Sequence, residues 1–132
     1  MRKEITVSSS EREQLVDITR DVNEVLRASP SSEGVCLVFA LHTTAGLTVN
    51  EGADPAVRGD ILKALKKAVP HDAGYGHSEG NSDSHVKCSL FGVSLPLMFS
   101  RRSLVLGQWQ SVYLCEFDGP RERKVVIHVL PE

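Results

Sequence analysis

The chain has 132 residues, a net charge of −2 and a composition of 41% hydrophobic and 24% charged residues, which is ordinary for one globular domain. Its basic residues are scattered, which argues against nucleic-acid binding. No apolar run approaches the roughly 20 residues of a membrane helix, and the N-terminus lacks the apolar stretch of a secretory signal. We therefore expect a single cytoplasmic domain over residues 1–132 that binds neither nucleic acid nor membrane.

The first elements in chain order are a short strand and a helix. The residues Lys3–Val7 predict the strand. Ser10 and Glu13 have the spacing of a capping box. Apolar residues then recur at helical spacing from Leu15 to about Ala28 and predict an amphipathic helix. A turn rich in serine follows it.

Two strands and a second helix are predicted next. Gly34–Leu41 is apolar throughout, which is typical of a central strand covered on both faces. Gly46–Asn50 predicts a further strand. Asp54 followed by Pro55 is an N-cap and first-turn pair, and the helix that it begins should run to Val69, just before a proline.

The C-terminal half is predominantly β in pattern. After a polar loop, Asp83 is expected to cap a short helix that ends at Gly92, although a strand is an alternative for that piece. Short strands are predicted at Leu95–Phe99 and at 104–106. A long alternating strand runs from Trp109 to 117, with Trp109 expected in the core or at a subunit interface. The last strand covers about 122–130.

The first polar segment begins at His42. This residue follows an apolar strand, so its imidazole is expected where a buried sheet meets solvent. Thr43 adds a hydroxyl, and the segment ends at Asn50 and Glu51. A hairpin would return these two residues close to His42, although a polar hairpin tip without any function gives the same pattern.

The second polar segment, His71–His85, reads HDAGYGHSEGNSDSH and contains three of the five histidines. Imidazole and carboxylate groups together form metal sites and acid–base sites. The spacing of His77 and His85 matches no short zinc motif, and a solvated loop with incidental histidines is the alternative. A loop of this length without apolar anchors is nevertheless uncommon in a compact domain unless it is functional or disordered.

The third polar segment covers residues 116–124. Asp118 followed by Gly119 indicates a hairpin turn. Arg121 and Arg123, two apart on a strand, are expected on the same face, where they could clamp a phosphate or a carboxylate. An exposed hairpin whose charges keep a sheet edge soluble explains the pattern equally well.

Four segments together resemble the YjbQ-like family, whose members are also called secondary thiamine-phosphate synthases. They read HTTAGLTVNE, GHSEGNSDSH, LGQWQ and FDGPRERKV, and they occur in the family's order across nearly the whole chain. The resemblance implies a single α+β domain with a mostly antiparallel, curved or barrel-like sheet and two to three packed helices. It also implies a homotrimer, with the polar segments gathered in one pocket near a subunit boundary.

We expect the polar side chains of these segments to divide into three groups. A divalent metal ion would be held by His42, His77 and His85. Catalytic roles are expected for Asn50, Glu51 and Asp83. Substrate contacts are expected from Thr43, Asn81, Asp118, Arg121 and Arg123.

Thiamine-phosphate synthesis expels pyrophosphate, which calls for Mg²⁺ and a basic side chain. Imidazole suits Zn²⁺ better than Mg²⁺, so the histidines fit that reaction poorly. We therefore favour a metal-dependent enzyme acting on a small phosphorylated compound, with thiamine-phosphate synthase activity as a side reaction. A non-catalytic trimer that binds a metal or a phosphometabolite, and a metal that only joins the subunits, are the alternatives.

Overall fold

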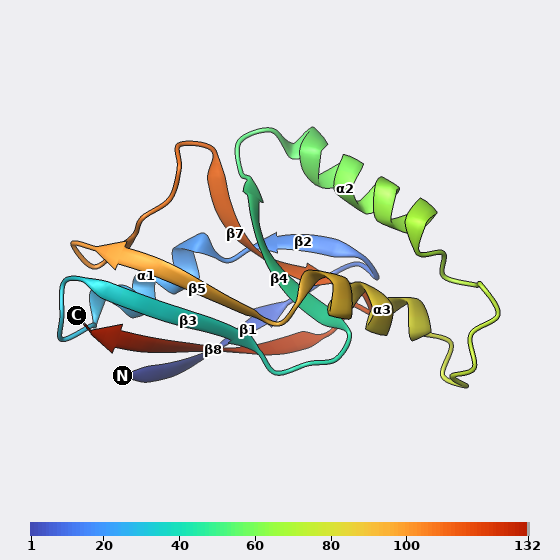
Figure 1. The fold of residues 1–132 in the computed structure, drawn as a ribbon, viewed down its shortest axis with the longest axis horizontal. Helices are drawn as coiled ribbons and strands as arrows, with labels where there is room; N and C mark the ends of the chain where they lie inside the picture. The colour runs from blue at the N-terminus through green and yellow to red at the C-terminus, as the bar shows by residue number, and fades with distance from the viewer. Residues whose placement is uncertain (132) are drawn as a thin grey trace.

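The computed structural model describes residues 1–131 and builds two antiparallel sheets and three helices (Figure 1). The elements are β1 (Arg2–Ser8), β2 (Gln14–Asp17), α1 (Thr19–Arg27), β3 (Gly34–Ala40), β4 (Ala45–Glu51), α2 (Pro55–Ala68), α3 (Ser82–Phe91), β5 (Ser94–Ser100), β6 (Ser103–Leu104), β7 (Gln110–Glu116) and β8 (Glu122–Pro131). One sheet has the order β1-β8-β3-β5-β6 and the other the order β2-β7-β4. The α+β fold predicted from the sequence is confirmed.

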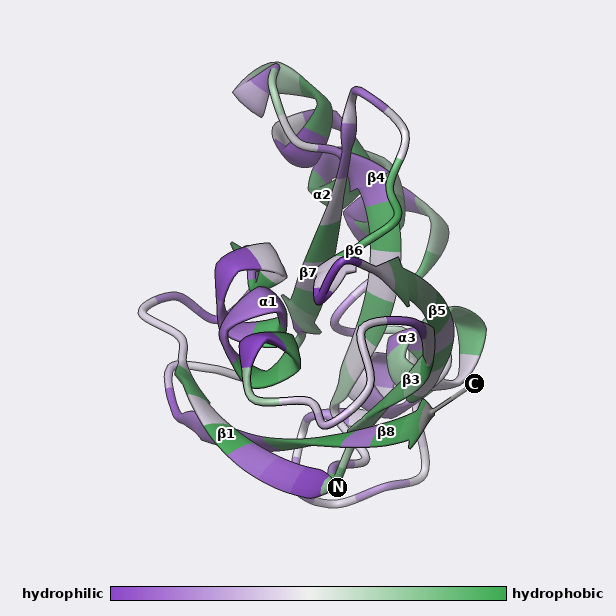
Figure 2. Ribbon diagram, turned by 90° about the vertical axis from the view of Figure 1, so that its left-hand side faces the viewer, coloured by the Kyte–Doolittle hydropathy of each residue, from purple (hydrophilic) through white to green (hydrophobic). Residues whose placement is uncertain are grey.

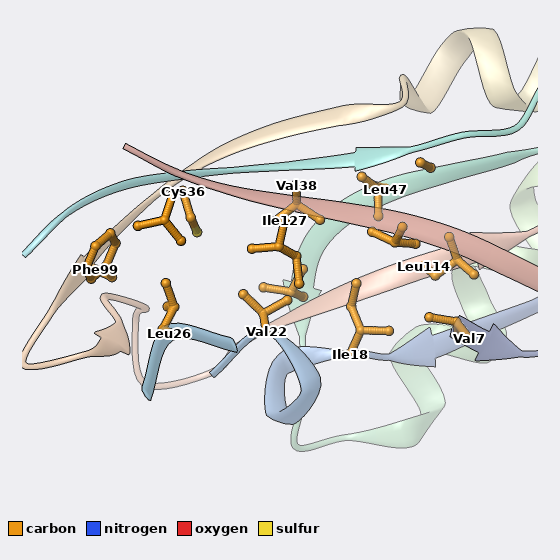
Figure 3. Close-up of a cluster of buried hydrophobic side chains, with 14 of the residues drawn as sticks. Val7, Ile18, Val22, Leu26, Cys36, Val38, Leu47, Phe99, Leu114 and Ile127 are labelled. Carbon is orange, nitrogen blue, oxygen red and sulfur yellow. The ribbon is translucent and has the colours of Figure 1, made fainter. Parts of the chain in front are cut away.

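The larger sheet curls into a half-barrel, and α1 packs on its inner face (Figure 2). Val22 and Leu26 of α1 are fully buried against Cys36, Val38 and Ile127 of the sheet (Figure 3). The alternation of each strand places these apolar side chains on its concave face. Burial of this face supplies the main driving force for the fold.

The outer face of the same sheet lies open in the single chain. β3 is central, between β8 and β5, as predicted. Its side chains nevertheless alternate between buried and accessible, so the prediction that both of its faces are covered is wrong for one chain. Val35, Phe39 and Met98 are exposed on this side, Met98 at 63%.

The smaller sheet is covered on both faces at β7. Val112 and Leu114 join the main core, whereas Tyr113, Cys115 and Phe117 form a second core with Leu15. The apolar side of α2 packs on that second core through Ile61, Leu62 and Leu65. The two faces predicted for this alternating strand are therefore confirmed.

Two local predictions are wrong. The helix α1 begins at Thr19, because Leu15 and Val16 pair with β7 as strand β2 instead. The expected capping box does not form, since the backbone N–H of Ser10 donates to the side chain of Gln14. Pairing with β7 gives this segment both backbone hydrogen bonds and the burial of Leu15, which local helix propensity cannot match.

The remaining elements follow their sequence signals closely. Asp54 caps α2 by accepting from the backbone N–H of Ala56. The segment after the polar loop is helical, as α3, and ends at Gly92 with φ +83°, but the residue at its N-cap is Asn81 rather than Asp83. Among residues 1–131, no helix combines the length and the apolar character that crossing a bilayer requires.

Candidate functional site

The three polar segments meet where β4 begins, α3 begins and β7 turns into β8. The backbone N–H of Lys124 donates to Nε2 of His42 at 2.6 Å. Asn81 donates to Asp118 at 2.8 Å, and Ser84 donates to the Phe117 carbonyl at 2.5 Å. These bonds bring residues that are far apart in sequence close together in the fold.

Strand pairing and one close helix contact bring the segments together. Ala45 pairs with Glu116, which places the start of β4 beside the end of β7. The end of α3 lies so close to β4 that a Cβ on Gly46 would stand 2.9 Å from Cβ of Phe91. Glycine therefore permits the packing of α3 at this position.

His77 and His85 form a pair of imidazoles near the protein surface. Their ring centroids are 5.4 Å apart with the ring planes perpendicular. His85 belongs to the second turn of α3, whereas His77 belongs to the loop before it. The same loop encloses a pocket of about 320 Å³ lined by His71, Asp72, Gly74, Tyr75, His77, Gly80 and Ser82. His71 is exposed, and its Nε2 contacts the carbonyl of Gly80 at 2.8 Å.

Arg121 is the accessible arginine of the third segment. Its Nε donates to the Asp118 carbonyl at 2.8 Å and its Nη2 to the Asp118 carboxylate at 3.0 Å. The side chain is still 50% exposed. A guanidinium has five N–H donors in a rigid fork, so Arg121 is held in place with donors free for an anionic ligand.

His42 is half-buried just after the end of β3, as expected, but its ring is already engaged in a hydrogen bond. Burial, with the positive charge of Arg123 next in effect, lowers the pKa of His42 and favours the neutral ring. Its Nε2 lone pair accepts the hydrogen bond from the Lys124 backbone and is not free to bind a metal ion. Within residues 1–131, no three or more His, Cys, Asp or Glu side chains are arranged so that they could hold a metal ion. The expected three-histidine site therefore does not form within one chain.

Asp83 is fully buried in a cluster of charged side chains, and this differs from the accessible catalytic carboxylate that we expected. Arg12 donates to both of its oxygens, at 3.0 and 3.2 Å, and Lys87 donates at 3.0 Å. Lys87 also binds Glu13 at 2.9 Å. Burial alone would raise the pKa of Asp83, but the bonds from Arg12 and Lys87 outweigh it and lower that pKa. This cluster holds α3 against the N-terminal segment.

Arg123 is 1% exposed, and the prediction that it shares an accessible face with Arg121 is wrong. Its guanidinium pairs with the buried carboxylate of Glu116 and donates to the carbonyl and hydroxyl of Thr44. Arg121 lies just before β8 begins, so the alternation of a strand does not apply to it. β7 and β8 also belong to different sheets, so the turn between them is not the expected hairpin.

Comparison with known proteins identifies the family. The family model described as "UPF0047 protein YjbQ-like" matches residues 3–132. The chain belongs to this family. A UPF0047 protein of Methanocaldococcus jannaschii is 39% identical over 94% of this chain and 90% of its own. The UPF0047 protein YugU of Bacillus subtilis is 38% identical over 98% and 99%.

Solved structures of the YjbQ-like family have the same fold. An uncharacterised family protein from Clostridium acetobutylicum superposes with a TM-score of 0.94 at 44% identity, over 97% of this chain and 99% of its own. A protein from Sulfolobus solfataricus, described as being of unknown function, gives a TM-score of 0.94 at 31% identity, over 100% and 97%. The family is thus uncharacterised in function, and these descriptions give no support to thiamine-phosphate synthase activity.

Asn50 and Glu51, which the YjbQ-like resemblance also placed in the site, lie at the C-terminal end of β4. β3 and β4 enter different sheets, so no hairpin returns Asn50 and Glu51 to His42. The seven residues of β4 separate Glu51 from that region by about 20 Å. The Glu51 carboxylate accepts from the backbone of Ala53 at 2.7 Å. Trp109 lies beside it, through the bond from the Gly52 N–H to the Trp109 carbonyl, and is 59% exposed rather than in the core.

Three further polar residues are relevant to this region, namely Thr43, Ser9 and Arg12. Thr43 is exposed next to the buried Thr44, and its expected substrate contact stays a prediction. Sequence reasoning missed Ser9, which donates to Glu116 at 2.7 Å, and Arg12, which neutralises Asp83. The polar run SSSERE carried both residues, but its spacing indicated only a helix cap.

Proposed function

We propose that this protein is a metal-dependent enzyme that acts on a small phosphorylated compound. The proposal rests chiefly on the imidazole pair of His77 and His85, which would hold the ion. Arg121 would bind the phosphate group of the substrate. The pair and the arginine are linked by Asn81, which occupies the N-cap position of the helix that carries His85 and donates to the same Asp118 carboxylate as Arg121.

The donor set suits a borderline ion such as Zn²⁺ better than Mg²⁺, because both donors are imidazole nitrogens. An ion about 2.1 Å from one nitrogen of each ring would leave the ring centroids roughly 5 Å apart. The 5.4 Å separation of His77 and His85 is compatible with this. A catalytic zinc ion usually has three protein ligands, so a third ligand is needed.

We propose that a second copy of the chain supplies the third ligand within a homotrimer. Glu51 and Trp109 belong to the family-like segments, but Glu51 ends β4, about 20 Å along the strand from the start of β4 where the polar segments meet. Exposed apolar side chains such as Trp109 and Met98 favour burial against another chain. In such an assembly, Glu51 of a second copy would complete the site.

Each of these side chains would have a separate role in the reaction. His77 and His85 hold the ion, which when bound would polarise a phosphoryl oxygen as a Lewis acid. Arg121 neutralises phosphate charge, and Asp118 fixes the orientation of its guanidinium. Thiamine-phosphate synthase activity would then be a side reaction, with Mg²⁺ accompanying the pyrophosphate substrate and Arg121 assisting the leaving group.

Metal binding tests this proposal. Untagged protein should bind Zn²⁺ in titrations by isothermal calorimetry. His77→Ala and His85→Ala should each weaken the affinity more than about 100-fold, beyond the 10–100-fold typical of changes outside the ligand shell. His128→Ala, on the larger sheet, is the matched control and should bind normally. Wild-type protein that binds none of Zn²⁺, Ni²⁺, Mn²⁺ and Mg²⁺ would refute the proposal.

A non-catalytic trimer that binds a metal or a phosphometabolite is the second candidate. It is favoured by the lack of a third ligand in the described part of one chain and by the use of Asp83 in a buried ion cluster. Phosphate or pyrophosphate release from a panel of phosphorylated metabolites distinguishes the two candidates. The enzyme requires release that disappears in Glu51→Gln, whereas a binder changes only in ligand affinity.

A further inference from the structure

Asn81 has an unusual hydrogen-bonding state at the start of α3. Among the buried side-chain nitrogen and oxygen atoms of residues 1–131, Oδ1 of Asn81 is the one that has no hydrogen-bond partner. Buried polar atoms nearly always have a partner, so such an exception calls for an explanation. The N-cap position does not provide one, because the Asn81 side chain makes no capping bond.

The orientation of this amide is fixed by its neighbour. Nδ2 of Asn81 donates to Asp118 at 2.8 Å. The Asp118 carboxylate oxygen accepts this hydrogen bond as well as one from Arg121, so a flipped amide would place two acceptor oxygens against each other. Oδ1 must therefore be the end of the amide that points away from Asp118, and it requires a donor.

A matching donor lies one helical turn further along the chain. The backbone N–H of His85 contacts the Asn81 carbonyl at 3.4 Å, so the two residues are neighbours in the first turns of α3. The His85 ring packs edge-on against His77 and makes no hydrogen bond within the described residues. His77 differs, because its Nε2 already lies 3.6 Å from Glu79.

We propose that Asn81 is a positioning residue whose Oδ1 accepts the ring N–H of His85 when the other ring nitrogen holds a metal ion. Ligating histidines nearly always donate their second nitrogen to such a partner. This inference rests on the proposed function, since it assumes that His85 is a metal ligand. It adds that Asp118 orients both the imidazole, through Asn81, and the Arg121 guanidinium, which donates to the same carboxylate oxygen.

Zinc affinity of Asn81→Ala tests the inference. The variant should bind Zn²⁺ about 10–100-fold more weakly than wild type, while Asn23→Ala, on α1 and away from the site, should bind normally. Asn81→Ser keeps a good N-cap residue and should show the same loss even if the alanine variant folds poorly. Thermal unfolding of the metal-free proteins checks that the affinities compare folded chains.

A nuclear magnetic resonance signal separates positioning from a general structural effect. In the zinc-loaded wild type, the His85 ring N–H proton should be protected from exchange with water and shifted downfield. Both Asn81 variants should lose this signal. The inference would be overturned if both Asn81 variants had normal zinc affinity and an unchanged signal. If His85→Ala lost zinc binding in the same experiments, the proposed function would remain intact. Equal, weak binding by wild type and His85→Ala would instead overturn the proposed function.

Discussion

Glu116→Gln is expected to lower the free energy of unfolding by about 3–5 kcal/mol, as is typical when a buried ion pair loses one partner. The substitution keeps the shape of the side chain but leaves the charge of Arg123 buried without a counter-ion. Arg123 is only 1% exposed, so its guanidinium has almost no contact with solvent that could replace the lost carboxylate. Urea unfolding at pH 7 measures the effect. Glu122→Gln, at an exposed neighbouring position, is the control and should change stability by less than about 0.5 kcal/mol.

The same variant should differ from wild type in its response to acid. Burial raises the pKa of Glu116, but hydrogen bonds from Arg123 and Ser9 outweigh that effect, so the pKa lies below its ordinary value. Because its pKa is lowered in the folded state, the Glu116 carboxylate contributes its full stabilisation above the unfolded-state pKa of about 4.3. This stabilisation is lost as the pH falls through the folded-state pKa. The stability gap between Glu116→Gln and wild type should therefore narrow below about pH 4. A gap that stays constant with pH, or is absent at pH 7, would contradict this account of the ion pair.

Asp83→Asn is expected to destabilise the fold by a similar amount, about 3–5 kcal/mol. The carboxylate of Asp83 binds both Arg12 and Lys87, and Lys87 is itself buried. Without Asp83, Glu13 alone faces two cations. Urea unfolding measures the loss, and Asp60→Asn on the exposed side of α2 is the matched control.

A double variant tests whether the uncompensated charge causes the loss. Asp83→Asn combined with Lys87→Met removes the buried cation along with its counter-ion. The double variant should therefore be more stable than the sum of the two single effects implies, by an interaction energy of about 1–3 kcal/mol. Strict additivity would mean that the two side chains act independently and that the cluster does not hold α3 as described.

The sequence was sufficient to locate most elements, because local patterns determine them. Alternation located β7 and assigned its two faces, and Asp54 with Pro55 marked the start of α2. The same kind of local signal failed for Leu15 and Val16, which pair with a strand about 100 residues away. Which sheet a strand joins depends on such distant partners, and for this reason Asp118-Gly119 resembled a hairpin turn although β7 and β8 are not paired.

The candidate site, like the fold, could be predicted only as far as local sequence patterns determine it. The density of histidines drew attention to the loop before α3, since few apolar residues there could account for it, and its role as a site stays a prediction. The state of each side chain depended on residues that spacing does not reveal. Asp83 is neutralised by Arg12, which is 71 positions away in the chain, and Nε2 of His42 is occupied by the backbone of Lys124. Glu51 was misplaced because a strand of seven residues carries it away from His42.

The central claim is that His77 and His85 hold one metal ion between them. Anomalous diffraction at the zinc absorption edge, from crystals of the zinc-loaded protein, tests it most directly. The account predicts a peak about 2.1 Å from one ring nitrogen of each histidine, with Glu51 of a second copy as a further ligand. A zinc peak elsewhere, or none near either ring, would contradict it.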